Sequence, residues 1–135
     1  MIGANDLGCE FAKSMALMGL GCGQTGSITI TDHEYIESLN YKRRYFFCPP
    51  DLGSSKSATA CNKAKMINPD LNFMANDVFV GPETENVFND EFWEGLDFVI
   101  NAVANTKARL YVDNQCVWYE KPLLESCTLG IKANS

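Results

Sequence analysis

The chain has 135 residues, of which 46% are hydrophobic and 21% are charged, and its formal net charge is −6. This composition is that of an ordinary folded domain with a modest core, and it excludes a wholly disordered chain. The acidic balance argues against nucleic acid as a partner, because phosphate binding needs clustered Lys and Arg. No run approaches the roughly 18 apolar residues that span a bilayer, so no membrane partner is expected.

Cysteine usage indicates neither a metal site nor a redox dithiol. The six cysteines are spaced unevenly, none belongs to a C-x-x-C pair, and His33 lies near none of them in the sequence. Zinc sites and redox dithiols usually have close spacing. We therefore expect free, mostly buried thiols and a cytoplasmic and nuclear location.

Helices and short apolar strands are predicted to alternate along the chain. Apolar residues recur at helical spacing over residues 9–20, 57–67 and 106–119, and glycines end the first of these helices. Short β-branched or apolar runs predict strands, over residues 27–31, 71–80, 97–102 and 123–126. The Pro49-Pro50 pair argues against a helix at that point.

This alternation predicts an α/β fold with a mostly parallel, doubly wound (Rossmann-like) sheet and helices on both faces. Ligands of such sheets bind beyond the carboxyl ends of the strands. Polar candidates follow the predicted strands at that edge, in residues 3–8, 32–44 and 101–107.

The sheet is expected to be truncated at both ends. Met1-Ile2 is too short for the strand from which a glycine loop normally springs, and the chain stops directly after a strand and a turn. A missing central strand leaves unpaired backbone on its neighbours. We therefore expect the isolated chain to fold poorly.

A glycine loop at the start of the chain nearly fits the strand–loop–helix nucleotide fingerprint. Gly3 and Gly8 occupy its outer positions, but Asn5 replaces the middle glycine that lets the backbone approach a phosphate. Asp6 adds a negative charge where phosphate would lie. A merely structural loop at the start of a helix explains the pattern equally well.

Asp32 follows the first predicted strand, where an acid can accept hydrogen bonds from ribose hydroxyls. An acid that caps a turn is the alternative, and the nearby glycine loop favours the functional interpretation. Arg43 and Lys56 are candidates for phosphate contacts, although a solitary Arg or Lys is usually a solvated surface group.

The sequence resembles those of ubiquitin-activating enzymes over essentially the whole chain. The strongest likeness is Lys121-Pro122-Leu123-Leu124-Glu125-Ser126, supported by Val80-Gly81-Pro82-Glu83-Thr84-Glu85 and Asn89-Asp90-Glu91-Phe92-Trp93. Shorter matches are Gly8-Cys9-Glu10, Gly19-Leu20-Gly21, Thr31-Asp32, Ile36-Glu37 and Thr128-Leu129-Gly130. The likeness is to the second, ATP-using adenylation half of those enzymes.

The resemblance implies a partial adenylation domain of the ThiF type over residues 1–135, without the catalytic-cysteine and ubiquitin-fold domains. Such enzymes bind ATP and Mg²⁺, adenylate the C-terminal glycine of ubiquitin and transfer ubiquitin to a cysteine as a thioester. The implied partners are ubiquitin or a ubiquitin-like protein, and a second adenylation half or the rest of a longer chain. None of the six cysteines matches the thioester cysteine.

The resemblance also implies roles for individual residues, carried over by position. Arg43 and Lys56 would contact the phosphates as catalytic groups, and Glu34 would reach the metal. Nucleotide-binding positions are expected at Gly3, Gly8, Asp32, Asn40, Arg43, Lys56 and Asn105.

Several positions depart from the family pattern. Asn5 replaces a loop glycine and Glu34 replaces an Asp, which is a milder change. The family's Ala-Leu-Asp-Asn-Val-Asp reads Ala-Val-Ala-Asn-Thr-Lys, so Ala104 and Lys107 stand where both acids are expected. A methyl group cannot coordinate Mg²⁺, and a neighbouring ammonium group would repel it.

These features leave three hypotheses. The chain is part of an enzyme that activates ubiquitin or a relative; or it is a non-catalytic relative, such as a scaffold, an inactive heterodimer partner or a gene relic. A dinucleotide-dependent oxidoreductase would explain the glycine loop but none of the remaining likeness. The altered nucleotide and metal positions predict no stand-alone activity.

Overall fold

The computed structural model describes residues 1–43, 46–129 and 132–134, and the description of side chains omits residues 41–43, 128, 129 and 132–134. Its centre is a set of parallel strands. β1 (Ile28–Thr31) pairs with β2 (Phe73–Asn76), and β3 (Val99–Asn101) pairs with β4 (Leu123–Glu125). The predicted parallel α/β architecture is confirmed.

Residue Ile2 joins the two strand pairs into one layer. It forms parallel bridges to Thr31 of β1 and to Asn101 of β3, and its backbone N–H donates to the carbonyl of Ile100 at 2.8 Å. The strand order is therefore β2-β1-(Ile2)-β3-β4. A single residue in the central position places the glycine loop that follows it at the carboxyl edge of both pairs.

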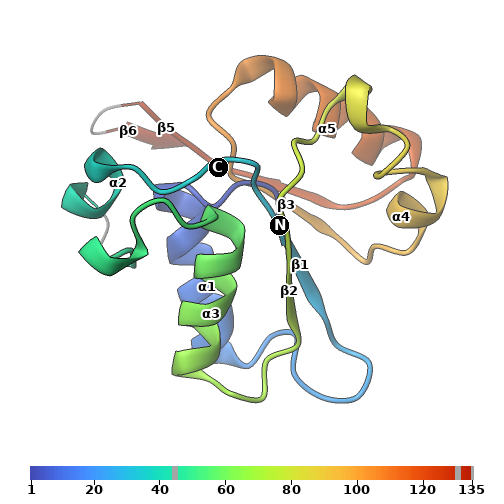
Figure 1. Ribbon diagram of the computed structural model, residues 1–135. Coiled ribbons are helices and arrows are strands. Elements are labelled where there is room, and N and C mark those ends of the chain that lie inside the picture. The colour runs from blue at the N-terminus through green and yellow to red at the C-terminus, as the bar shows by residue number, and fades with distance from the viewer. Residues whose placement is uncertain (44–45, 130–131, 135) are drawn as a thin grey trace.

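Helices cover both faces of this layer (Figure 1). α1 (Asp6–Met18) and α3 (Lys56–Ile67) lie side by side on one face, and α4 (Asp90–Glu94) and α5 (Thr106–Trp118) lie on the other. The small residues Ala12, Ala60 and Ala64 are fully buried between α1 and α3. Their short side chains let these two helices pack closely.

A second buried cluster lies under α4 and α5. Phe88, Trp93, Val99 and Val112 are each at most 2% exposed. The Trp93 indole N–H donates to the carbonyl of Phe88 at 3.0 Å, so the buried ring has a partner for its one polar group. Hydrophobic burial on both faces is what the doubly wound arrangement needs.

The remaining elements are short. They are α2 (Ser38–Arg43), the 3₁₀ helices η1 (Pro49–Asp51) and η2 (Pro82–Thr84), and the antiparallel pair β5 (Cys127–Leu129) and β6 (Lys132–Asn134). We expected no helix at Pro49-Pro50, and this was wrong because a 3₁₀ helix begins at Pro49. Proline fits the first turn of a helix, where its missing N–H has no intrahelical partner, and the carboxylate of Asp51 accepts from Cys48 N–H at 2.7 Å.

The predicted strand over residues 71–80 is longer than the observed β2. β1 offers four residues for pairing, so β2 ends at Asn76 with its last partner, Thr31. The Thr31 hydroxyl donates to the carbonyl of Val78 at 2.7 Å, which holds the chain across the carboxyl edge after it leaves the sheet.

Among the described residues, no helix has both the length and the apolar character needed to cross a bilayer.

Candidate functional site

A cavity of about 400 Å³ lies at the carboxyl edge of the sheet, where β1, β2, β3 and the Ile2 position all end. Its size falls within the range of about 300–1,000 Å³ that is common for small-molecule sites. The lining residues come from the segments that follow each strand and from the start of α5: Ile2, Gly3, Asn5, Thr31, Asp32, His33, Glu34, Val78, Phe79, Val80, Val103, Ala104, Asn105 and Ala108. The position is the one predicted from the strand order.

The glycine loop requires glycine at both of its outer positions. Gly3 has a φ of 94°, a conformation that L side chains rarely adopt, and an added Cβ would lie 3.1 Å from the carbonyl carbon of Ala102. A Cβ on Gly8 would overlap the carbonyl oxygen of Gly3. The two glycines therefore let α1 start directly against the loop.

The side chain of Asn5 caps the N-terminus of α1. Its Oδ1 accepts from the backbone N–H of Gly8 at 3.1 Å, and its Nδ2 donates to the carbonyl of Ala102. The Gly8 N–H is one of the helix donors that an anion at this N-terminus would otherwise use. Asn5, which replaces the middle glycine of the fingerprint, thus competes with phosphate for the Gly8 N–H as well as for space.

Asp32 ties the glycine loop to the end of β1. One carboxylate oxygen accepts from Ala4 N–H at 2.7 Å, and the other accepts from Glu34 N–H at 2.9 Å. A carboxylate has about four acceptor positions, so contacts with ribose hydroxyls remain possible beside these two bonds. Both interpretations of Asp32 fit this geometry: it stabilises a turn, and it lines the cavity.

Glu34 and Lys56, which were expected to act on metal and phosphate separately, form an ion pair with each other. The Lys56 side chain is 6% exposed, whereas that of Glu34 is 57% exposed. Glu34 lines the cavity and Lys56 does not. Lys56 therefore reaches the cavity through Glu34, and its charge is partly offset before any phosphate binds.

The β3 side of the cavity lacks an acid. Ala104 lines it, and Asn105 caps α5 by accepting from Lys107 N–H at 2.9 Å and from Ala108 N–H at 3.5 Å. Lys107 is exposed and is not among the residues that line the cavity.

The described residues do not fit a magnesium ion held by side chains. They include no group of three or more His, Cys, Asp and Glu that could hold a metal ion. Of the two acids that line the cavity, Asp32 accepts from backbone amides and Glu34 pairs with Lys56. Mg²⁺ prefers oxygen ligands in near-octahedral order, and the Ala104 methyl supplies none.

Two expected nucleotide-binding residues lie elsewhere or beyond the described side chains. Asn40 accepts from Glu37 N–H at 2.7 Å and does not line the cavity. Arg43 ends α2, and its side chain lies outside the described residues. The structure thus brings Gly3, Asp32, Glu34 and Asn105 together, with Gly8 buried behind the loop.

Sequence reasoning did not single out the β2 side of the cavity or His33. The His33 ring meets the Phe79 ring edge-on, with centroids 5.1 Å apart and an angle of 84°, and both line the cavity. Val78 and Val80 line it beside them. A prediction that ended the strand at residue 76 would have placed Val78 to Val80 at the ligand-binding edge.

All six cysteines are free. Burial raises the pKa of the Cys61 thiol to about 11 and that of Cys116 to about 11, so neither is a nucleophile near neutral pH. Cys127 is half-buried and follows β4.

The parallel sheet and the glycine loop at its carboxyl edge define a Rossmann-like nucleotide-binding domain. The model of the ThiF family matches residues 1–135, and the chain belongs to that family. It is 52% identical over 135 residues to "Ubiquitin-activating enzyme E1 2" of Arabidopsis thaliana and 50% identical over 135 residues to the wheat (Triticum aestivum) enzyme of the same name. The chain spans 12% and 13% of the length of these two relatives, respectively.

Solved structures give the same fold. The chain superposes on the "E. coli tRNA N6-threonylcarbamoyladenosine dehydratase, TcdA, in complex with AMP" with a TM-score of 0.78 and 22% identity. The match covers 92% of this chain and 47% of that one. At this identity the likeness establishes the architecture alone.

Proposed function

We propose that this chain is the nucleotide-binding core of a ubiquitin-activating enzyme, which contacts the sugar and phosphates of ATP but does not itself hold magnesium. The observation that carries the proposal is the composition of the cavity at the carboxyl edge. Gly3 and Asp32 line it where Ile2 and β1 end, whereas Ala104 lines it after β3. The site therefore has ligands for a nucleoside and no side-chain ligand set for a divalent ion.

The reaction of the relatives would need more than these residues. Adenylation forms a bond between the C-terminal carboxylate of ubiquitin and the α-phosphate of ATP, and it breaks the bond to pyrophosphate. Magnesium supplies charge stabilisation in such reactions. In this chain Asp32 would orient the ribose, and Lys56 and Arg43 would offset phosphate charge. Ubiquitin or a ubiquitin-like protein is the proposed partner, with the second adenylation half or the rest of a longer chain.

The same cavity favours a second candidate, a non-catalytic relative that serves as a scaffold or as the inactive half of a heterodimer. Both candidates predict nucleotide binding without turnover by this chain alone. They differ when partners are added, since an adenylation domain completed by the rest of an enzyme would consume ATP. A non-catalytic half would leave ATP intact under the same conditions.

Calorimetric titration of ATP and AMP, in Mg²⁺ and in EDTA, tests the first candidate. We expect the dissociation constant of ATP to differ by less than about twofold between the two conditions, because no side chain links the ion to the protein. Ala104→Asp should make ATP binding about tenfold tighter in Mg²⁺ than in EDTA, which corresponds to about 1.4 kcal/mol. A tenfold loss of wild-type affinity in EDTA contradicts the proposal.

Asp32→Asn tests the nucleoside contacts and has a matched control. Asp70→Asn changes the charge equally, and Asp70 is exposed between α3 and β2, outside the cavity. We expect Asp32→Asn to weaken AMP binding about tenfold and Asp70→Asn to leave it unchanged. Equal affinities for both variants would exclude the Asp32 contact.

Exchange of labelled pyrophosphate into ATP tests for catalysis directly. With ubiquitin present, we expect no exchange above a blank without ubiquitin. Clear exchange would show that the chain adenylates ubiquitin without the acid at position 104. The double variant Asn5→Gly/Ala104→Asp should regain ATP affinity, and a folded double variant that binds no better would exclude these two residues as the cause.

A further inference from the structure

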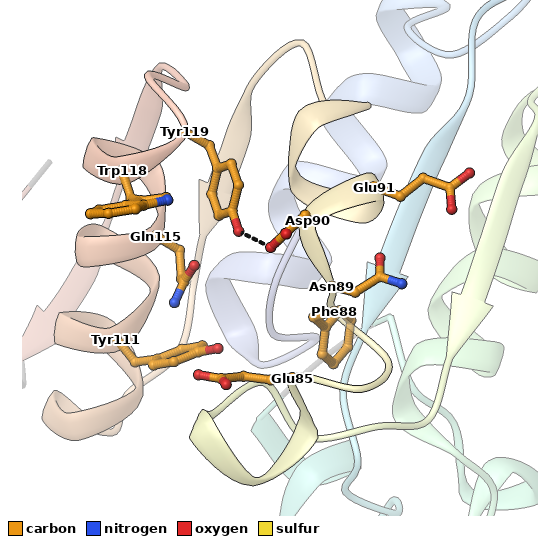
Figure 2. Close-up of a pocket in the computed structure, with 9 residues that line it drawn as sticks. All are labelled: Glu85, Phe88, Asn89, Asp90, Glu91, Tyr111, Gln115, Trp118 and Tyr119. Atoms are coloured by element: carbon orange, nitrogen blue, oxygen red, sulfur yellow. Dashed lines mark hydrogen bonds between the residues drawn. The ribbon is translucent and has the colours of Figure 1, made fainter.

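A second pocket, of about 490 Å³, lies between the segment that leads into α4 and the outer face of α5 (Figure 2). It shares no lining residue with the cavity at the carboxyl edge. Its lining is formed by aromatic and acidic or amide side chains: Glu85, Phe88, Asn89, Asp90, Glu91, Tyr111, Gln115, Trp118 and Tyr119. The proposed nucleotide site uses none of these residues.

The aromatic wall combines one fixed ring and one uncovered ring. Tyr119 stacks on the buried Trp93, with ring centroids 6.2 Å apart and an angle of 7° between the planes. Trp118, the residue that directly precedes Tyr119 at the end of α5, is 79% exposed. An indole left so open at the edge of a pocket is a large flat surface that a ligand can cover.

The charge of this pocket is of one sign. Glu85, Asp90 and Glu91 line it, and no Lys or Arg is among the lining residues. The whole stretch of residues 66–106 contains eight acids and no Lys or Arg. Aromatic rings beside carboxylates attract a cation through the ring faces and through direct charge pairing.

Two tyrosine hydroxyls lie beside carboxylates of the pocket. The Tyr119 hydroxyl donates to Asp90 Oδ1 at 2.5 Å. The Tyr111 hydroxyl is buried, and no partner at hydrogen-bonding geometry occurs for it in the described part of the chain. Figure 2 shows that Glu85 faces this hydroxyl, and burial followed by the Glu85 charge raises the pKa of Tyr111.

We propose that this pocket binds the guanidinium group of an arginine in a basic segment of a partner protein. A guanidinium group is planar, so its N–H groups can pair with Glu85 while one of its faces lies against the neighbouring Tyr111 ring. The peptide beside that arginine would then cover the exposed Trp118 ring, which lies at the other end of the pocket (Figure 2). An ammonium group pairs with the acid as a point charge but cannot stack in the same way. The acidic surface around the pocket favours basic residues on either side of that arginine by charge complementarity.

A titration of the whole chain with acetyl-Gly-Arg-Gly-amide, followed by NMR of the two indole N–H signals, tests the assignment. We expect a saturable shift of the Trp118 signal, while Trp93, which is 1% exposed, serves as the internal reference. The citrulline peptide, which has the same shape without the charge, and the lysine peptide should each bind at least about tenfold more weakly. Equal binding of either peptide, or no saturable shift of Trp118 at the solubility limit of the arginine peptide, overturns the proposal.

Glu85→Gln and its control Asp113→Asn locate the charge that is responsible. Asp113 is an exposed acid on α5 that does not line the pocket, and each substitution removes one negative charge. We expect Glu85→Gln to weaken arginine-peptide binding about tenfold and Asp113→Asn to weaken it less than twofold. Equal effects of the two substitutions would assign the binding to the net charge of the surface and would overturn the pocket.

Discussion

The two walls of the cavity at the carboxyl edge are built in different ways. The wall at β1 is held by the backbone: Gly3 and Gly8 allow close approach, and Asp32 binds the N–H of Ala4. The wall at β3 presents Ala104, whose side chain makes no hydrogen bond and is exposed. The first wall cannot change without disturbing the start of α1, whereas the second can exchange an acid for a methyl group at little structural cost. The β1 wall is therefore coupled to folding, and the β3 wall is free to change with function.

The largest expected effect on stability is that of Gly8→Ala, which changes the β1 wall. The added Cβ overlaps the Gly3 carbonyl oxygen, so the loop or α1 must shift, and we expect a loss of about 1–3 kcal/mol in the free energy of unfolding. Urea denaturation measures this loss. In the control Gly95→Ala, φ is −72° and the new Cβ lies 3.2 Å from the Glu91 carbonyl oxygen, so the loss should stay below about 1 kcal/mol. Equal losses would mean that the loop does not depend on close approach.

Asp32→Asn should come next. An amide group keeps one acceptor oxygen but turns an NH₂ group toward one of the two backbone donors, Ala4 N–H or Glu34 N–H. We expect a loss of about 1–2 kcal/mol in the free energy of unfolding. A value indistinguishable from that of Asp70→Asn would show that Asp32 does not fasten the loop.

The ion pair between Lys56 and Glu34 predicts an asymmetric result. Glu34→Gln removes the carboxylate that a nearly buried ammonium group contacts, so it should destabilise the fold by about 1 kcal/mol. Lys56→Met removes the buried charge itself and leaves an exposed acid, so it should be near neutral. Thermal unfolding of both variants measures the difference, and a larger loss for Lys56→Met would contradict this description of the pair.

The smallest effect should be that of Ala104→Asp on stability. The side chain is exposed at the β3 wall, so the free energy of unfolding should change by no more than about 0.5 kcal/mol. Denaturation in the absence of nucleotide and metal measures this change. A loss as large as that of Gly8→Ala would remove the distinction between the two walls.

The sequence predicted those parts of the molecule that depend on local pattern. The helices at residues 6–18, 56–67 and 106–118 follow apolar spacing and caps, and the strands around Ile30 and Ile100 are short apolar runs. Helix α4 was not predicted, although the sequence contains signals for the start of a helix. Asn89 caps α4 by accepting from Phe92 N–H, and the acids Asp90 and Glu91 lie in its first turn. Five residues are too few for a periodic pattern to show.

Tertiary contacts explain what the sequence could not supply at the site. The pairing of Glu34 with Lys56 joins residues 22 positions apart, and the bond from Asn5 to Ala102 joins residues 97 positions apart. No spacing rule predicts either contact. The likeness to ubiquitin-activating enzymes assigned the metal to Glu34 and the phosphates to Lys56, and the structure adds that these two residues bind one another.

The chain is expected to bind a nucleotide without coordinating the divalent ion of that nucleotide. Electron paramagnetic resonance of Mn²⁺, titrated into ATP with and without the chain, measures the free ion directly. We predict that wild-type chain leaves free Mn²⁺ at the level set by ATP alone and that Ala104→Asp lowers it. A wild-type chain that lowers free Mn²⁺ as strongly as the Ala104→Asp variant would contradict the account.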